Sequence, residues 1–79
     1  MSQAMPLVML PEGKEGKVVS INAGYGLKRR LVEMGFCENS TVKIHRADRG
    51  ALVVVVNGSK YALGRGMAMK IMVTCVTDC

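Results

Sequence analysis

Three cysteines and one histidine are the residues whose side chains could hold a transition metal. Cys75 and Cys79 are separated by three residues near the end of the printed sequence, and Cys37 lies alone. His45 is the only histidine. Protein metal sites usually combine four ligands in tightly spaced pairs, and no second pair exists here. We therefore predict no metal site in the monomer and reduced thiols, as in the cytosol. Metal binding by cysteines of several chains stays an open alternative.

The positions of these residues in the alternating pattern also favour structural roles. Cys75 falls on the same face as Ile71 and Val73, so we expect a small core residue there. His45 alternates onto the opposite, outer face of its segment and is expected on the surface.

The sequence contains no recognisable catalytic arrangement. The phosphate-binding pattern G-x-x-x-x-G-K-[ST] is absent, and Gly24-Tyr25-Gly26 lacks the Gly-Lys that would have to follow it. No pair of carboxylates shares one face, and His45 has no nucleophile beside it. We predict that the protein is not an enzyme, with no catalytic residue and no bound cofactor.

A basic cluster, Lys28-Arg29-Arg30, stands at the start of the one segment with helical periodicity. Cations near a helix N-terminus oppose the macrodipole and cost about 0.3–1 kcal/mol each when exposed. This unfavourable placement suggests use in docking a partner, with Tyr25 as a neighbouring contact. The alternative is a solvated helix face on which one arginine pairs with Glu33 or Glu38.

Methionine is abundant, with seven residues in a chain of 79. Most are expected to fill gaps in the core. Met67 and Met69 flank a glycine-rich turn, and exposed methionines there would suit an adaptable contact with another protein. They complete the candidate partner-binding set of Tyr25, Lys28, Arg29, Arg30, Met67 and Met69.

Length and charge restrict the class of protein. Seventy-nine residues form one domain with a small core, and Lys plus Arg number 11 against 6 Asp plus Glu, for a net charge of +5. This balance suits an acidic protein, an anionic membrane surface or a nucleic acid, and does not choose among them. Two tyrosines and one phenylalanine are too few for a base-stacking platform, so no nucleic acid is expected. We find no signal peptide or membrane span.

Periodicity predicts a mostly β domain with one short helix. The helix is expected over Leu27–Met34, because apolar residues recur there at i, i+4 and i+7. Gly35 should close it in a left-handed conformation, with Phe36 against Leu31. The predicted strands are Lys17–Asn22, Thr41–Arg46, Ala51–Val56, Lys60–Leu63 and Lys70–Val76.

The connections complete this prediction. Asn57-Gly58 is the strongest hairpin signal, Leu7–Leu10 between two prolines reads as a short edge segment, and Gly64–Ala68 as a single 3₁₀ turn. Val19 and Ile21 are expected to share one face of the first strand. We predict a partly open five-stranded barrel with the helix after the first strand. It would form a single domain over residues 1–79, with a core at about 7–76 and frayed ends.

The central block resembles a known family. Lys28-Arg29-Arg30 followed by Leu31-Val32-Glu33-Met34-Gly35-Phe36 is similar to the hallmark R-R-L-x-x-M-G-F of FeoA proteins, small accessory proteins of ferrous iron transport. The resemblance covers about residues 7 to 74. Further matches are Gly13, Gly16, Val18, Ile21, Thr41-Val42-Lys43-Ile44, Arg46-Ala47, Val53, Val55, Gly58, Leu63-Gly64-Arg65, Ala68, Ile71 and Val73.

This resemblance implies a Src-homology-3-like barrel in the cytoplasm that needs no cofactor of its own. It implies a partner, the cytosolic GTPase domain of a membrane ferrous iron transporter, which the module would regulate or help assemble. Attachment at the inner face of the membrane would then be indirect, and a homo-oligomer stays open. The alternative is a metal- or nucleic-acid-linked regulatory domain resembling the C-terminal domain of iron-dependent repressors.

Overall fold

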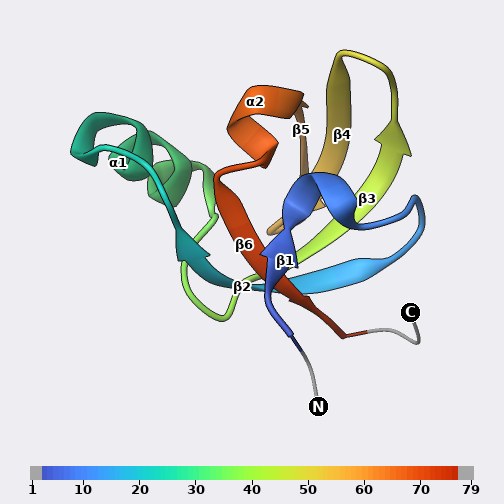
Figure 1. Cartoon of the computed structure of the whole chain (residues 1–79), viewed down its shortest axis with the longest axis horizontal. Helices are drawn as coiled ribbons and strands as arrows, with labels where there is room; N and C mark the ends of the chain where they lie inside the picture. Colours follow the sequence, from blue (N-terminus) through green and yellow to red (C-terminus); the bar gives the residue numbers. More distant parts are fainter. Residues whose placement is uncertain (1–2, 77–79) are drawn as a thin grey trace.

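A computed structural model describes residues 3–76 and shows one curled antiparallel sheet with a helix at its side (Figure 1). The expected frayed ends fall largely on residues 1, 2 and 77–79, outside the described residues. The elements in chain order are β1 Met5–Pro6, the 3₁₀ helix η1 Leu7–Met9, β2 Glu15–Ile21, α1 Tyr25–Met34, β3 Thr41–Ala47, β4 Ala51–Val56, β5 Ser59–Gly64, α2 Arg65–Ala68 and β6 Ile71–Cys75.

The sheet has the strand order β1-β6-β2-β3-β4-β5 and confirms the partly open barrel. It contains six strands where five were predicted, because Met5 and Pro6 pair with Val73 and Met72 of β6. The expected edge segment at Leu7–Leu10 is wrong. The chain turns into the barrel there as η1, and this turn buries Leu7 and Leu10 completely or nearly so.

A β-bulge in β2 overturns the predicted faces of the first strand. Val18 pairs with Val73 and Ser20 with Met72, so Val19 is an extra residue on the β2 side. A bulge shifts the alternation by one position. Val18 and Ile21 therefore both enter the core, whereas Val19 is 42% exposed.

Of the two tight connections predicted between β4 and β6, one is confirmed and the other is not. Asn57 and Gly58 have φ values of 53° and 77°, as a type I′ hairpin turn requires, which confirms the predicted hairpin between β4 and β5. The 3₁₀ turn expected at Gly64–Ala68 is one turn of α-helix, α2. The Met69 N–H reaches the Arg65 carbonyl at 2.9 Å, the spacing of an α-helix.

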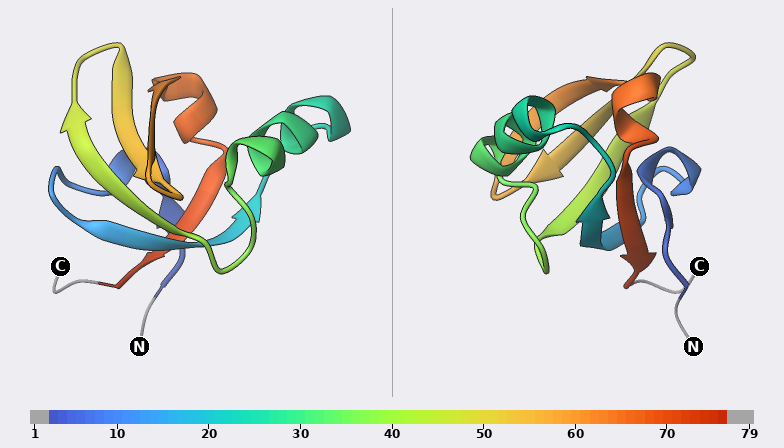
Figure 2. Two further views of the ribbon diagram at one scale, coloured as in Figure 1. Left: turned by 180° about the vertical axis from the view of Figure 1, so that it is seen from behind. Right: turned by 60° about the vertical axis from the view of Figure 1, so that its left-hand side comes forward.

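The core is aliphatic, as the composition predicts, and draws on almost every element. β4 contributes three buried residues, Leu52, Val54 and Val56, and α1 contributes Leu31. The whole set is Leu7, Leu10, Val18, Ile21, Leu31, Phe36, Val42, Ile44, Leu52, Val54, Val56, Leu63, Ala68, Ile71 and Val73. Figure 2 shows that α1 lies beside the barrel, whereas α2 covers one end of it.

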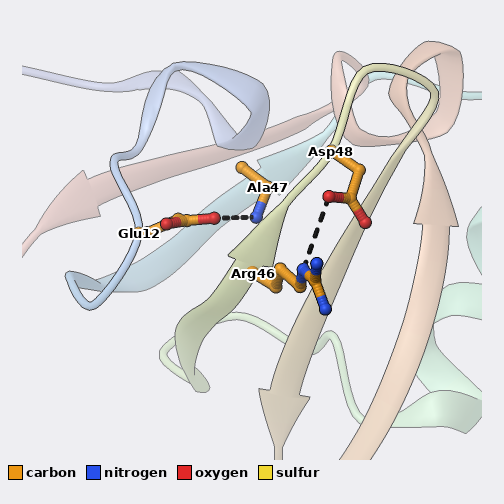
Figure 3. A network of polar contacts seen from close by, with 4 residues as sticks. All are labelled: Glu12, Arg46, Ala47 and Asp48. Atoms are coloured by element: carbon orange, nitrogen blue, oxygen red, sulfur yellow. Dashed lines mark hydrogen bonds and ion pairs between the residues drawn. The ribbon is translucent and has the colours of Figure 1, made fainter.

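Polar contacts tie the turn before β2 to the end of β3 (Figure 3). The Ala47 N–H donates to a carboxylate oxygen of Glu12 at 2.6 Å. Arg46 and Asp48 form an ion pair at 3.4 Å, and the Asp48 N–H donates to the Ala51 carbonyl. These contacts define the short turn between β3 and β4. Within residues 3–76, no helix is long and apolar enough to cross a membrane.

Candidate functional site

The helix α1 ends in a rigid, well-defined way. Gly35 has φ 114°, its N–H donates to the Val32 carbonyl, and the Phe36 N–H donates to the Leu31 carbonyl at 2.9 Å. This is the predicted Schellman motif, with Phe36 and Leu31 both fully buried. The Phe36 ring also lies 6.3 Å from the Tyr61 ring of β5, so the end of the helix is fixed to the barrel.

The other end of α1 lacks such support. The helix starts at Tyr25, two residues earlier than predicted, so Tyr25 is itself part of the helix. Gly24 caps it without a side-chain hydrogen bond, and no acidic residue lies in the first turn. Because the basic cluster also opposes the macrodipole, this turn is poorly optimised for helix stability. Such local violations are expected where a surface serves binding.

One flank of α1 presents a mixed apolar and basic surface. Tyr25, Lys28, Arg29 and Val32 recur at i, i+3, i+4 and i+7, so they form one stripe. The Tyr25 side chain is 80% exposed, and Val32 is 42% exposed. Together with Glu33 these residues line a shallow hollow of about 540 Å³.

A deeper groove of about 220 Å³ adjoins this stripe between α1 and β2. Lys28 and Val32 line both hollows, so the two form one continuous surface. We call the deeper hollow the α1–β2 groove. Its apolar part can bury a partner's side chain, and Lys28 and Glu38 supply charges at its rim. The lining residues are Val18, Ser20, Ile21, Lys28, Val32, Phe36, Cys37 and Glu38.

The three basic residues of the cluster have different surroundings. Arg29 forms an exposed ion pair with Glu33 at 3.5 Å. This is the pairing expected if Arg29 lies on a solvated helix face. Lys28 lines the groove, whereas Arg30 lies about 200° around the helix from Lys28, on the other flank. No ion pair joins the side chains of Lys28 or Arg30 to another residue within 3–76.

The two candidate methionines lie apart from this surface. Met67 is in α2 and packs half-buried against the core, so the expectation that it is exposed is wrong. Met69 follows α2 and is 59% exposed. Neither residue lines the hollow or the groove at α1.

The potential metal-binding residues are not brought together within the described chain. His45 is exposed in β3, as predicted, and Cys37 is an exposed free thiol beside α1. Cys75 is partly buried against the core but is disulfide-bonded, so the expectation of reduced thiols is wrong for this residue. Cys79 lies outside the described residues. Within residues 3–76, no three His, Cys, Asp or Glu side chains could hold a metal ion together.

Sequence reasoning missed several residues of the groove. Val32 could have been found, because it continues the i, i+3, i+4, i+7 stripe that begins at Tyr25. Ser20, Cys37 and Glu38 had no such signal. They reach the groove because the bulge in β2 and the turn after Gly35 bring two segments together.

Comparisons with known proteins agree on one family. The model of the FeoA domain matches residues 5–75. A curated protein of Methanocaldococcus jannaschii with the provisional name Fe(2+) transport protein A is 46% identical over 68 residues, 86% of this chain and 83% of its own length.

Solved structures of FeoA proteins match this chain over nearly its whole length. The crystal structure of the iron uptake regulatory protein FeoA has a TM-score of 0.87 and 28% identity, over 94% of this chain and all of that one. FeoA of Stenotrophomonas maltophilia, complexed with zinc and described as an SH3 domain protein, has a TM-score of 0.76 and 26% identity, over 92% and 88% of the chains.

The alternative relationship to repressors extends to the fold alone. A manganese-dependent transcriptional repressor has a TM-score of 0.83 but 23% identity, and the match covers 96% of this chain and 44% of the repressor. In the described chain α1 is followed by a strand and not by a second helix, so residues 3–76 contain no helix-turn-helix for reading DNA.

Proposed function

Because the chain belongs to the FeoA domain family, we propose that it is a non-enzymatic accessory module of ferrous iron uptake, which acts by binding a protein partner. The name of the Methanocaldococcus relative supports the link to Fe(2+) transport. The proposed partner is the cytosolic GTPase domain of a membrane ferrous iron transporter. The module would then work in the cytoplasm, at the inner face of the membrane through this partner.

The observation that carries the proposal is the continuous surface formed by the exposed stripe of α1 and the α1–β2 groove. Tyr25 offers a large, amphipathic side chain at low entropic cost, as interface tyrosines do. Val32 extends the apolar contact area into the groove. Lys28 adds a charge without a partner among residues 3–76, which can steer an approaching acidic surface.

The rigid end of α1 is the second reason to favour this surface. Leu31, Gly35 and Phe36 fix the helix to the barrel, so the stripe is held in one orientation before binding. A pre-oriented surface loses less conformational entropy when a partner binds. The first turn leaves the Tyr25 side chain exposed, so this side chain is available for contact.

Binding kinetics with the isolated GTPase domain test the proposal. Tyr25→Ala should weaken binding about tenfold, the effect of losing roughly 1.4 kcal/mol at a contact residue. Lys28→Glu should slow association and reduce the dependence of the association rate on salt. Thermal unfolding serves as the control, because both side chains are exposed and lie off the buried face of α1.

Arg30→Glu is the matched control for Lys28→Glu. The two variants change the net charge equally, yet Arg30 lies on the opposite flank of the same helix. A docking contact at the groove predicts a larger effect for Lys28→Glu, including faster dissociation. Equal effects of both variants would indicate long-range steering only and would contradict docking at this surface. Unchanged kinetics in a folded Tyr25→Ala variant would contradict it as well.

A further inference from the structure

The two edges of the sheet are built differently. The edge strand β1 has two residues and ends in Pro6, and both features discourage pairing with another chain. The opposite edge strand β5 has six residues, Ser59–Gly64, and no proline. Figure 2 (left) shows β5 beside β4 at this end of the sheet. β5 is therefore the edge at which a further strand could be added.

The hairpin geometry identifies the free backbone groups of β5. In a two-residue hairpin the residues that flank the turn, here Val56 and Ser59, exchange both hydrogen bonds. Hydrogen-bonded pairs then alternate along the ladder, so the N–H and C=O groups of Lys60 and Ala62 point away from β4. Among residues 3–76, these groups make no backbone hydrogen bond outside the β4–β5 ladder.

The β5 edge is also regular and sterically open. Its residues pair one to one with Ala51–Val56 without a register shift, whereas β2 and β3 both contain bulges. Lys60, Ala62 and Gly64 are exposed, and the last two have little or no side chain. A straight edge with small exposed residues is a template for strand addition.

Charge favours one type of added strand. The segment Arg49–Val76, which includes β4, β5, α2 and β6, contains four basic residues and no acidic residue. Lys60 and Arg65 stand near the two ends of β5, and both are exposed. A second copy of the chain would bring this positive segment against itself, at a cost of like-charge repulsion. An acidic segment would meet complementary charge.

We propose that the β5 edge binds an extended acidic segment of a partner protein by strand addition. The backbone of the segment would complete the free hydrogen bonds of Lys60 and Ala62, and its carboxylates would lie near Lys60 and Arg65. This contact is separate from the α1–β2 groove, to which β5 contributes no residue. It stands whether or not the groove binds a GTPase domain.

The test uses the full chain and an acetylated, amidated hexapeptide of alternating glutamate and valine. Ala62→Pro removes the outward N–H while the ladder to β4 keeps its hydrogen bonds, because proline is tolerated at edges. We expect Ala62→Pro to weaken peptide binding at least tenfold, and the matched variant Ala62→Ser, which keeps the N–H, to stay within twofold. Equal binding by the two folded variants would overturn the proposal.

Two further measurements keep the test decisive if Ala62→Pro fails to fold. In the wild-type chain the peptide should slow hydrogen exchange of the Lys60 and Ala62 amides at least tenfold, and unchanged exchange would overturn strand addition. A lysine–valine hexapeptide should bind the wild-type chain at least tenfold more weakly than the glutamate–valine hexapeptide. In the Lys60→Glu variant the affinities for the two peptides should lie closer together. Equal binding of both peptides would overturn the acidic class.

Sedimentation tests whether a second copy of the chain occupies the edge instead. The proposal is overturned if the wild-type chain self-associates at micromolar concentration and binds neither peptide. A change of this self-association in Lys60→Glu would show that the β5 edge pairs with the second copy. A chain that stays monomeric and binds the glutamate–valine peptide supports it.

Discussion

The hairpin β4–β5 and the helix α1 differ in what stabilises them. β4 buries every second residue, and each of its six residues pairs with one of β5. In contrast, α1 has ten residues and buries only Leu31 completely. The hairpin is therefore stabilised along its whole length. The helix is held by one face, where fully buried Leu31 lies between partly buried Leu27 and Met34, and by its C-terminal end.

This contrast explains why the candidate site lies on α1. An element that is fixed at one end and on one face leaves its flanks free for other uses. In α1 one flank carries Tyr25, Lys28 and Val32 and leads into the groove with β2. The inner face of β4 has no such freedom, because a substitution there would leave a cavity in a close-packed core.

Loss of the single buried side chain of α1 should have the largest effect on stability. Leu31→Ala is expected to lower the free energy of unfolding by about 2–5 kcal/mol, because it removes a fully buried leucine and leaves a cavity. Val32→Ala is the matched control on the exposed flank and should cost about 0.5 kcal/mol or less. Denaturant unfolding of both variants measures the difference. Similar losses would contradict the assignment of the buried face.

Adding a side chain at Gly35, at the C-terminal end of α1, should have the next largest effect on stability. Gly35→Ala should destabilise by about 1–3 kcal/mol, because residues other than glycine are strained at its φ of 114°. A Cβ atom there would also lie 2.6 Å from the Asn57 side chain of the β4–β5 turn, so that amide would have to move. Thermal unfolding measures the loss. If Gly35→Ala is as stable as wild type, the left-handed Gly35 and its contact with the β4–β5 turn do not fix the end of the helix.

The same substitution at the other end of α1 should act in the opposite direction. Gly26 lies in the first turn, and a Cβ atom there would have no neighbour within 4 Å. Gly26→Ala should therefore raise the free energy of unfolding by about 0.5–1 kcal/mol, because alanine loses less conformational entropy in a helix. Destabilisation in the same thermal assay would mean that the first turn is packed more closely than the structure shows.

The exposed ion pair of α1 should have the smallest effect. Glu33→Gln removes the partner of Arg29 and should change stability by less than about 0.5 kcal/mol, because exposed pairs are screened and the arginine precedes the glutamate. The change should become smaller at high salt. Unfolding at two salt concentrations measures it, and a loss above about 1 kcal/mol would indicate a structural role for the pair.

Local chemistry in the sequence determined the parts of the fold that depend on neighbouring residues. Asn57-Gly58 accepts positive φ at both positions, so the hairpin and the strand Ala51–Val56 follow directly. Gly35 followed by Phe36 similarly defines where α1 ends. The family motif overlaps this helix end, so the residues that close the helix also carried the resemblance to the FeoA family.

Only the tertiary structure decided the features that depend on contacts between distant segments. The bulge at Val19 arises where β2 pairs with β6, more than fifty residues away, and it reverses the faces that simple alternation predicts. The turn into η1 exists because the barrel has room to bury Leu7 and Leu10.

The candidate site divides in the same way. Lys28 was predicted from its charge and its place in the helix, and Tyr25 only as a neighbouring residue before the helix. The stripe that joins the two became visible once α1 was found to begin at Tyr25. The groove that makes the stripe a binding surface was not predictable. It depends on how β2, α1 and the segment Phe36–Glu38 pack together, and packing brings together residues that no local pattern in the sequence connects.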